Sequence, residues 1–157
     1  MLPARSQIAA VAITSIAVVA IAAYSLARST IEVPLSTQIR HDDFTFAVAD
    51  VRTIAPAEAS KIIVVHLKVE NDALRVGYAW DPSIAYLVDE RGRRYAADQR
   101  RSSPPTNIGA GDRSIVALEY HVPSDASGLR LAFWDTILMG DVFDGLKYAR
   151  VRLLLPD

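Results

Sequence analysis

A run of 19 uncharged, mainly apolar residues, Ile8 to Leu26, lies near the start of the chain and governs how the rest can be organised. As an α-helix rising about 1.5 Å per residue, this run would be roughly 28 Å long, which matches the hydrocarbon core of a bilayer. The residues after it contain no second apolar stretch of that length. The sequence therefore predicts one N-terminal transmembrane helix that carries one domain outside the lipid.

A cleaved secretory signal is the competing interpretation of this segment. Arg5 supplies a short basic region, and Ser25-Leu26-Ala27 or Ala20-Ile21-Ala22 supply small-residue cleavage sites. We favour an uncleaved anchor because the apolar part of a signal peptide is usually about 7 to 15 residues long. Basic residues on the two sides of the run are nearly balanced, so the orientation rests on the long β domain that follows, which is usually exported. Arginine in excess of lysine and abundant alanine favour a bacterial source, which places the anchor in the inner membrane and the domain in the periplasm or outside the cell.

Small residues recur on the faces of the predicted anchor. Ala10 and Thr14 share one face at helical spacing, and Ala20, Ala23 and Ala27 share another. Small side chains allow helix backbones to approach closely in membranes, so these residues predict packing against integral membrane protein subunits. The alternative is that alanine is simply tolerated on a helix that faces the lipid bilayer.

The residues after the anchor are mildly acidic and contain no cysteine. Arg5 and Arg28 flank the anchor, so 15 of the 17 basic residues follow it, against all 18 acidic residues. This balance argues against nucleic acid as a partner. The lack of cysteine rules out disulfides, thiolate metal sites and iron–sulfur clusters, so the domain must be stabilised by packing alone.

Apolar and polar residues alternate with a period of two along most of the remaining chain, which is typical of half-buried strands. Strands are predicted at 44–48, 61–70, 84–88, 94–96, 116–122, 129–133 and 148–155. The segment 61–70 has the strongest pattern, with Ile63, Val65, Leu67 and Val69 on one face, and is expected to be central in its sheet. The segments 84–88 and 94–96 flank a turn at 89–92 and predict a hairpin.

Four motifs built on turn residues follow one another along the predicted domain. They are a strand ending in Asn71 (63–71, IVVHLKVEN), an Asp-x-x-Gly-x-x-Tyr hairpin within 87–95 (LVDERGRRY), an Ala-Gly-Asp turn at 110–112 and a strand closing on Pro123 (116–123, VALEYHVP). In this order they resemble a bacterial family of exported immunoglobulin-like domains of unknown function, although Ala110 stands where that family has proline. The resemblance implies a β-sandwich that is secreted or attached to a membrane, and it brings no catalytic residues.

These features together predict an all-β immunoglobulin-like antiparallel sandwich preceded by a single N-terminal transmembrane helix. The predicted boundaries are 1–28 for the anchor, 29–39 for a tether and 40–157 for the sandwich.

Few residues suggest catalytic or metal chemistry. The three histidines, His41, His66 and His121, are scattered over a loop and two strands, and no pair has the spacing of a metal site. Asp135, Asp141 and Asp144 lack the alternating spacing of a calcium loop and are expected to be solvated turn residues. There is no Gly-x-Ser-x-Gly elbow and no phosphate-binding glycine loop. We therefore expect no catalytic activity, no metal and no cofactor.

An arginine cluster and two tryptophans are the candidates for contact with a partner. The cluster comprises Arg91, Arg93, Arg94, Arg100 and Arg101. Arginine is favoured at interfaces because its planar guanidinium pairs with two acceptors at once, and buried aromatic residues dominate binding energy. We predict a partner interface at Trp80, Arg94, Arg100 and Arg101. The alternatives are an ordinary solvated edge for the arginines and core packing for Trp80 and Trp134.

Two functions follow from these predictions. The first is a non-catalytic, single-pass accessory subunit of a larger membrane complex, such as a respiratory or photosynthetic one, whose β domain docks on the outer face. The alternative is a freestanding cell-envelope domain, anchored or secreted, that binds or senses a ligand, and it predicts a concave apolar site. An electron-transfer or other enzymatic role would need cofactor ligands that the sequence does not supply.

Overall fold

The computed structural model describes residues 17–18, 21–22, 30–41, 43–57, 59–133 and 151–156. The chain divides into two compact units, 1–30 and 31–157. In the first unit, the described residues 17–18 and 21–22 are helical. The predicted packing residues Ala10, Thr14, Ala20, Ala23 and Ala27 lie outside the described residues. Within the described part of the chain, no helix is long and apolar enough to cross a membrane.

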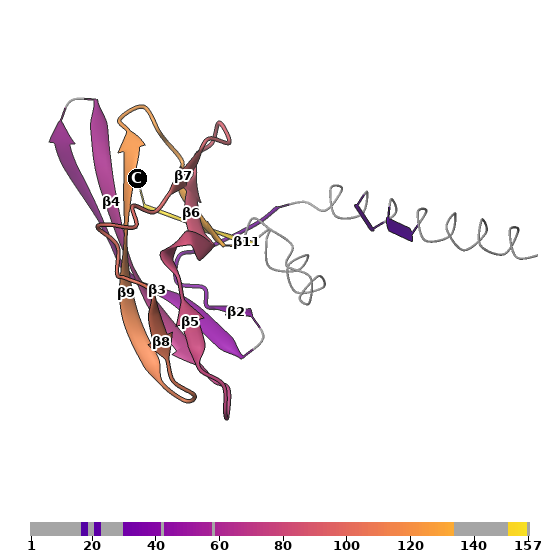
Figure 1. Ribbon diagram of the computed structural model, residues 1–157. Coiled ribbons are helices and arrows are strands. Elements are labelled where there is room, and N and C mark those ends of the chain that lie inside the picture. Colours follow the sequence, from indigo (N-terminus) through magenta and orange to yellow (C-terminus); the bar gives the residue numbers. More distant parts are fainter. Residues whose placement is uncertain are drawn as a thin grey trace, which may run out of the picture. The chain divides into compact units, whose positions relative to one another are not determined.

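The second unit is built from two main sheets (Figure 1). The five-stranded sheet contains, in spatial order, β1 (Ile31–Val33), β11 (Val151–Leu154), β10 (Arg130–Phe133), β6 (Ala85–Val88) and β7 (Arg94–Ala96). The four-stranded sheet contains β2 (Ile39–His41), β3 (Phe44–Ala57), β4 (Ser60–Asn71) and β9 (Arg113–Pro123). A third pair is formed by β5 (Tyr78–Trp80) and β8 (Thr106–Ile108), and one 3₁₀ helix, η1, spans Pro82–Ile84. All neighbouring strands are antiparallel except β1 and β11.

The core lies between the two main sheets. On β4, the residues Ile63, Val65, Leu67 and Val69 are at most 2% exposed, whereas the residues between them are only partly buried. β4 pairs with β3 on one side and with β9 on the other, which confirms the predicted central strand. Opposite inward residues come from the five-stranded sheet, including the fully buried Leu87, Leu131 and Leu153. Burial of these side chains, at about 25 cal/mol per Å² of apolar surface, is the main stabilising contribution to the fold.

Four short strands, β1, β2, β5 and β8, differ from the sequence-based expectation. β2 includes His41, which is expected in a loop. The segment 29–39 is predicted as a tether, but Ile31–Val33 forms β1 and pairs with residues 151–153 of β11, so part of the tether belongs to the sandwich. Ile31 and Val33 alternate around Glu32, which forms an ion pair with Arg130 of β10. β5 and β8 lie in stretches where the alternating pattern predicts no strand. Three residues are too few for a period of two to stand out in a sequence.

The predicted hairpin is confirmed, and its turn residues are held by one buried carboxylate. β6 pairs with β7 around Gly92, whose φ is +78°, a conformation that favours glycine. Asp89, only 2% exposed, accepts hydrogen bonds from the Arg93 backbone N–H (2.8 Å), Arg93 Nε (2.6 Å) and the Tyr95 hydroxyl (3.0 Å). Burial raises the pKa of Asp89, but the Arg93 and Tyr95 hydrogen bonds and the Arg93 charge outweigh it and lower the pKa to about 2. The Asp-x-x-Gly-x-x-Tyr motif is thus a structural device of the turn.

Asn71, at the end of β4, performs a similar task at the opposite end of the domain. Its Nδ2 donates to the carbonyl oxygens of Val76 (2.8 Å) and Ile108 (3.0 Å), and its Oδ1 accepts from the Ala73 N–H (3.0 Å). Its backbone exchanges hydrogen bonds with the turn at 110–112, where Gly111 has a φ of +76°. The strand-ending asparagine and the Ala-Gly-Asp turn therefore meet, and together they fasten the β4–β5 loop.

Candidate ligand-binding site

A pocket of about 300 Å³ opens at the end of the sandwich where β3 and β4 meet the β9–β10 connection. Its lining residues come from β3 and β4 (Thr53, Lys61 and Ile63), from the connection (Ser124, Ala126, Ser127, Gly128 and Leu129) and from the C-terminal segment (Pro156). The lining combines apolar side chains with hydroxyl groups and one ammonium group. This combination is typical of sites that bind small molecules.

Backbone hydrogen bonds hold the β9–β10 connection in place from three sides. The Ser124 N–H donates to the carbonyl of Ala59 in the β3–β4 turn at 3.1 Å, and the Glu90 N–H of the β6–β7 hairpin donates to the Ser127 carbonyl at 3.2 Å. The Leu155 N–H donates to the Leu129 carbonyl at 3.0 Å. The pocket wall is thus tied to two hairpins and to the C-terminal segment, so the pocket is largely preformed.

Lys61 enters the pocket because of its position on β4. Alternate residues of a strand point to the same face, so Lys61 shares the inward face with Ile63 and Val65. Its side chain is partly buried, and Nζ donates to the Ala126 carbonyl oxygen at 2.7 Å. Among the described residues, Lys61 forms no ion pair with a carboxylate, and the ammonium group retains two further N–H donors.

Two acidic residues that adjoin this wall, among those the structure describes, interact with other groups. Asp125 pairs with Arg91 (2.8 Å) and, through its other oxygen, with Arg93 (3.2 Å). The hydrogen bond from Arg93 is the main cause of the lowered pKa of the Asp125 carboxyl, so this residue stays ionised and paired. Glu90 accepts a hydrogen bond from the Ser127 hydroxyl. The positive charge of Lys61 is therefore not neutralised by either carboxylate.

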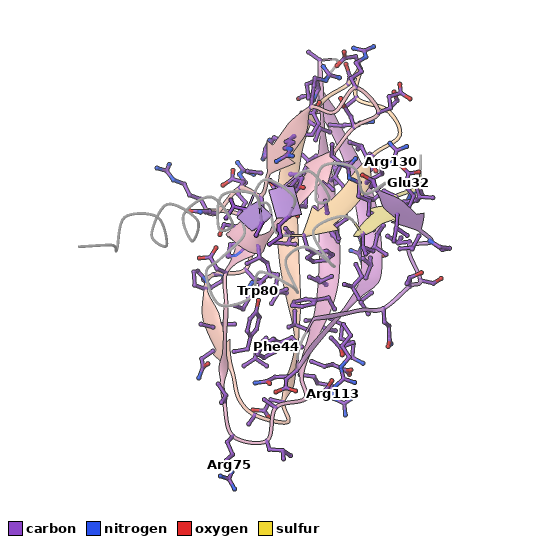
Figure 2. All side chains as sticks on the ribbon, turned by 90° about the vertical axis from the view of Figure 1, so that its right-hand side faces the viewer. Glu32, Phe44, Arg75, Trp80, Arg113 and Arg130 are labelled. Atoms are coloured by element: carbon purple, nitrogen blue, oxygen red, sulfur yellow. The ribbon has the colours of Figure 1, made fainter. Side chains whose placement is uncertain are left out.

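The residues of the predicted interface differ in burial and in their contacts. Trp80 is 1% exposed and belongs to the core, so the core-packing alternative describes it and its indole is not available at the surface (Figure 2). Arg94 lies with its guanidinium carbon 5.1 Å from the centre of the Tyr86 ring. Arg100 and Arg101 are exposed, and Arg101 Nη1 is 3.5 Å from Glu119.

The histidines are likewise dispersed. His66 Nδ1 lies 3.6 Å from Asp50 Oδ2, and His121 Nε2 lies 3.0 Å from Glu119 Oε1, each on the outer face of the four-stranded sheet. No group of three potential metal ligands comes together within the described residues. Asp135, Asp141, Asp144 and Trp134 lie outside the described residues.

An exposed apolar tip at the other end of the domain was not expected from the sequence. Leu74 is 94% exposed and Val76 is 64% exposed in the β4–β5 loop, and we refer to these two residues and Arg75 between them as the apolar tip. Figure 2 shows Arg75 at the outer end of this loop, away from Glu32 and Arg130. The hydrogen bonds of Asn71 hold the loop, so the apolar side chains are presented by an ordered backbone.

No protein-family model matches the sequence, and no curated protein sequence does. Among solved structures, the chain is similar to the secreted protein MPT63 of Mycobacterium tuberculosis, with a TM-score of 0.57 and 13% identity over 82% of this chain and 99% of that chain. It is also similar to an uncharacterized β-sandwich protein of Clostridium difficile 630 (TM-score 0.54, 11% identity, 82% of this chain and 96% of that one). A third similar structure is the yjhA protein of Bacillus subtilis (TM-score 0.51, 13% identity, 78% of this chain and 98% of that one). At these identities the likeness shows the fold alone, and it confirms the predicted antiparallel β-sandwich.

Proposed function

We propose that this protein is an exported, non-catalytic domain of the bacterial cell envelope that binds a small ligand in the pocket at Lys61. The pocket is the observation that carries this proposal, since a freestanding binding domain requires a concave site with apolar walls and a few polar groups. Export is supported by the structural likeness to a secreted protein and by the apolar run at Ile8 to Leu26.

The lack of catalysis is supported by the chemistry of the pocket lining. None of the described lining residues is a histidine, cysteine or carboxylate, which are the commonest general bases and activated nucleophiles. The Ser127 hydroxyl donates a hydrogen bond to Glu90, and among the described residues it is not paired with an imidazole. Lys61 Nζ donates a hydrogen bond to the Ala126 carbonyl oxygen and not to a reacting side chain. This arrangement fits binding without a chemical step.

The same proposal includes a transmembrane anchor at residues 1–28 and an immunoglobulin-like sandwich, with the lipid bilayer as a contact of the anchor. The test is purification of the tagged full-length chain in a mild detergent, followed by measurement of its intact mass and identification of whatever migrates with it. We expect a chain of 17.1 kDa that runs without a stoichiometric protein partner. A shorter chain would show that the segment is a cleaved signal, and a stoichiometric membrane partner would contradict the freestanding function.

A second candidate function is an accessory subunit bound to integral membrane proteins. The apolar tip is the observation that favours it, because exposed apolar side chains on an ordered loop often mark protein contacts. Replacement of Leu74 by serine should then reduce co-purification of the partner, and so should replacement of Arg100 and Arg101 by glutamate. Ile115→Ser provides the control, because Ile115 is likewise an exposed apolar residue, at 64%, but lies on β9. Replacement of Ala10 and Ala20 by leucine tests packing of the anchor separately.

A further inference from the structure

We infer that the pocket selects a small organic anion, whose charged group binds the Lys61 ammonium and whose short apolar body lies against Ile63, Ala126 and Leu129. This inference rests on the proposed function and adds the chemical class of the ligand.

The position of Lys61 is the first reason. The pleat of β4 directs this side chain into the pocket at the edge of the space between the sheets, where it is partly buried. An ammonium group has three N–H donors, and the structure satisfies one of them through the Ala126 carbonyl at 2.7 Å. A carbonyl oxygen carries no net charge, so the site keeps a positive charge that a ligand anion can neutralise.

The surroundings of Lys61 preserve that charge. Asp125 directly precedes Ala126, yet both of its oxygens are engaged by arginines of the β6–β7 hairpin, at 2.8 Å from Arg91 and 3.2 Å from Arg93. Glu90 is engaged by the Ser127 hydroxyl. The hydroxyl groups of Thr53 and Ser124 line the same pocket and add donors for an anionic group. Donors that have no matching carboxylate among the residues the structure describes favour an anion over a cation or a neutral polar molecule.

The apolar lining and the size of the pocket define the rest of the ligand. Ile63 and Ala126 are each 2% exposed and Leu129 is 7% exposed, so these three apolar residues close the pocket on the side of the core, and we refer to them as the apolar floor. A volume of 300 Å³ corresponds to about ten water molecules of liquid water. This space suits a carboxylate or phosphate on a short hydrocarbon body.

The test uses the full-length, ¹⁵N-labelled chain in non-ionic detergent micelles and three probes of related shape. Isobutyrate carries a charge and an apolar body, isobutyramide has the same shape without the charge, and inorganic phosphate has the charge without the body. Amide signals of Ile63, Ala126 and Leu129 report binding during each titration at pH 7. We expect isobutyrate to bind about fivefold more tightly than isobutyramide, which is the effect of a partly exposed charge pair, and phosphate to bind more weakly than isobutyrate.

The substitution Lys61→Met keeps the apolar stem and should abolish the preference for isobutyrate. Lys68→Met is the matched control, because Lys68 lies on the same strand but pairs with Glu70 at 2.6 Å on the outer face, and the preference should persist. Lys61→Arg retains the charge and should retain the preference.

Each result decides between the inference and the proposed function. Equal affinity of the wild-type chain for isobutyrate and isobutyramide would overturn the anion selectivity and leave ligand binding intact, whether or not Lys61→Met folds. Phosphate that binds as well as isobutyrate would contradict the role of the apolar floor. Binding of none of the three probes would overturn both the inference and the proposed function.

Discussion

Replacement of Asn71 by alanine removes three hydrogen bonds from one buried side chain and should unfold the domain at a clearly lower temperature. Asn71 is 1% exposed, and its amide connects the Ala73 N–H and the carbonyls of Val76 and Ile108. Alanine makes none of these contacts. The substitution therefore leaves three backbone groups without the partner that the fold provides.

The size of the effect depends on which of these groups water can reach. Ala73 is 6% exposed and Ile108 is 3% exposed, so their backbone groups lie in the interior, where an unpaired donor or acceptor costs about 1 to 3 kcal/mol. Val76 is 64% exposed, and water can replace the lost bond to its carbonyl at little cost. The free energy of unfolding should therefore fall by about 3 kcal/mol. For a domain of this size, the melting temperature should fall by about 12 °C.

Circular dichroism of the full-length chain, heated in detergent, measures this change. Asn107→Ala is the control, because Asn107 is the other asparagine of the chain and is exposed on β8, and its melting temperature should change by less than about 2 °C. Hydrogen exchange of the Ala73 amide should also accelerate in Asn71→Ala but not in the control. A fall of less than about 4 °C for Asn71→Ala would refute the claim that this side chain fastens the loop.

Three further predictions concern the turns and two titrating groups. Gly111→Ala should cost about 1 kcal/mol because φ is +76° while nothing obstructs the added Cβ, and an unchanged melting temperature would show that the turn relaxes without strain. The Asp89 carboxyl should titrate near pH 2 by NMR. Because its pKa is lower in the folded state than in the unfolded chain, the stability that this carboxylate contributes should be present above about pH 4 and lost as the pH falls toward 2. Asp89→Asn should not show this loss. Burial, and secondarily the charge of Asp81, raise the pKa of Tyr78 to about 12, so the stability that the neutral phenol contributes should be lost as the pH rises from about 10 to 12. Tyr78→Phe should reduce the loss in the alkaline unfolding curve without abolishing it, because burial also raises the pKa values of Tyr120 and Tyr95.

The long strands and tight turns were predictable because their causes are local. Inward-facing apolar residues recur at every second position along β4. The glycine at position 92 marks the hairpin turn, where the backbone has a positive φ. The short strands were not predictable because their causes are distant. Ile31 is in a strand only because it pairs with Val151, which lies 120 residues further along the chain. No local pattern of three residues carries that information.

The surroundings of the side chains in the predicted interface could likewise not be predicted from local sequence. Five arginines close together in sequence favour an exposed basic patch, but the fold brings Asp125 to Arg91 and Arg93 from more than 30 residues away. Those two arginines are therefore structural partners of the hairpin and the β9–β10 connection. Trp80 is similarly ambiguous in sequence, since an aromatic residue beside Tyr78 suits a core and an interface equally well. Only its 1% exposure distinguishes the two.

Lys61 does have a signal in the sequence, because it continues the inward row of Ile63 and Val65 at the start of a strand. A lysine at such a position usually extends its stem along apolar surface and places its charge in water. Whether a carboxylate then neutralises this charge depends on which acidic residues the fold brings close to it. Asp125 is the natural partner, since it precedes the residue whose carbonyl Lys61 contacts, but Arg91 and Arg93 occupy both of its oxygens. Arg91 and Arg93 do not line the pocket, but by pairing with Asp125 they leave the positive charge of Lys61 without that partner. The sequence of the β6–β7 hairpin predicts only a turn, and this effect on the pocket appears only in the folded domain.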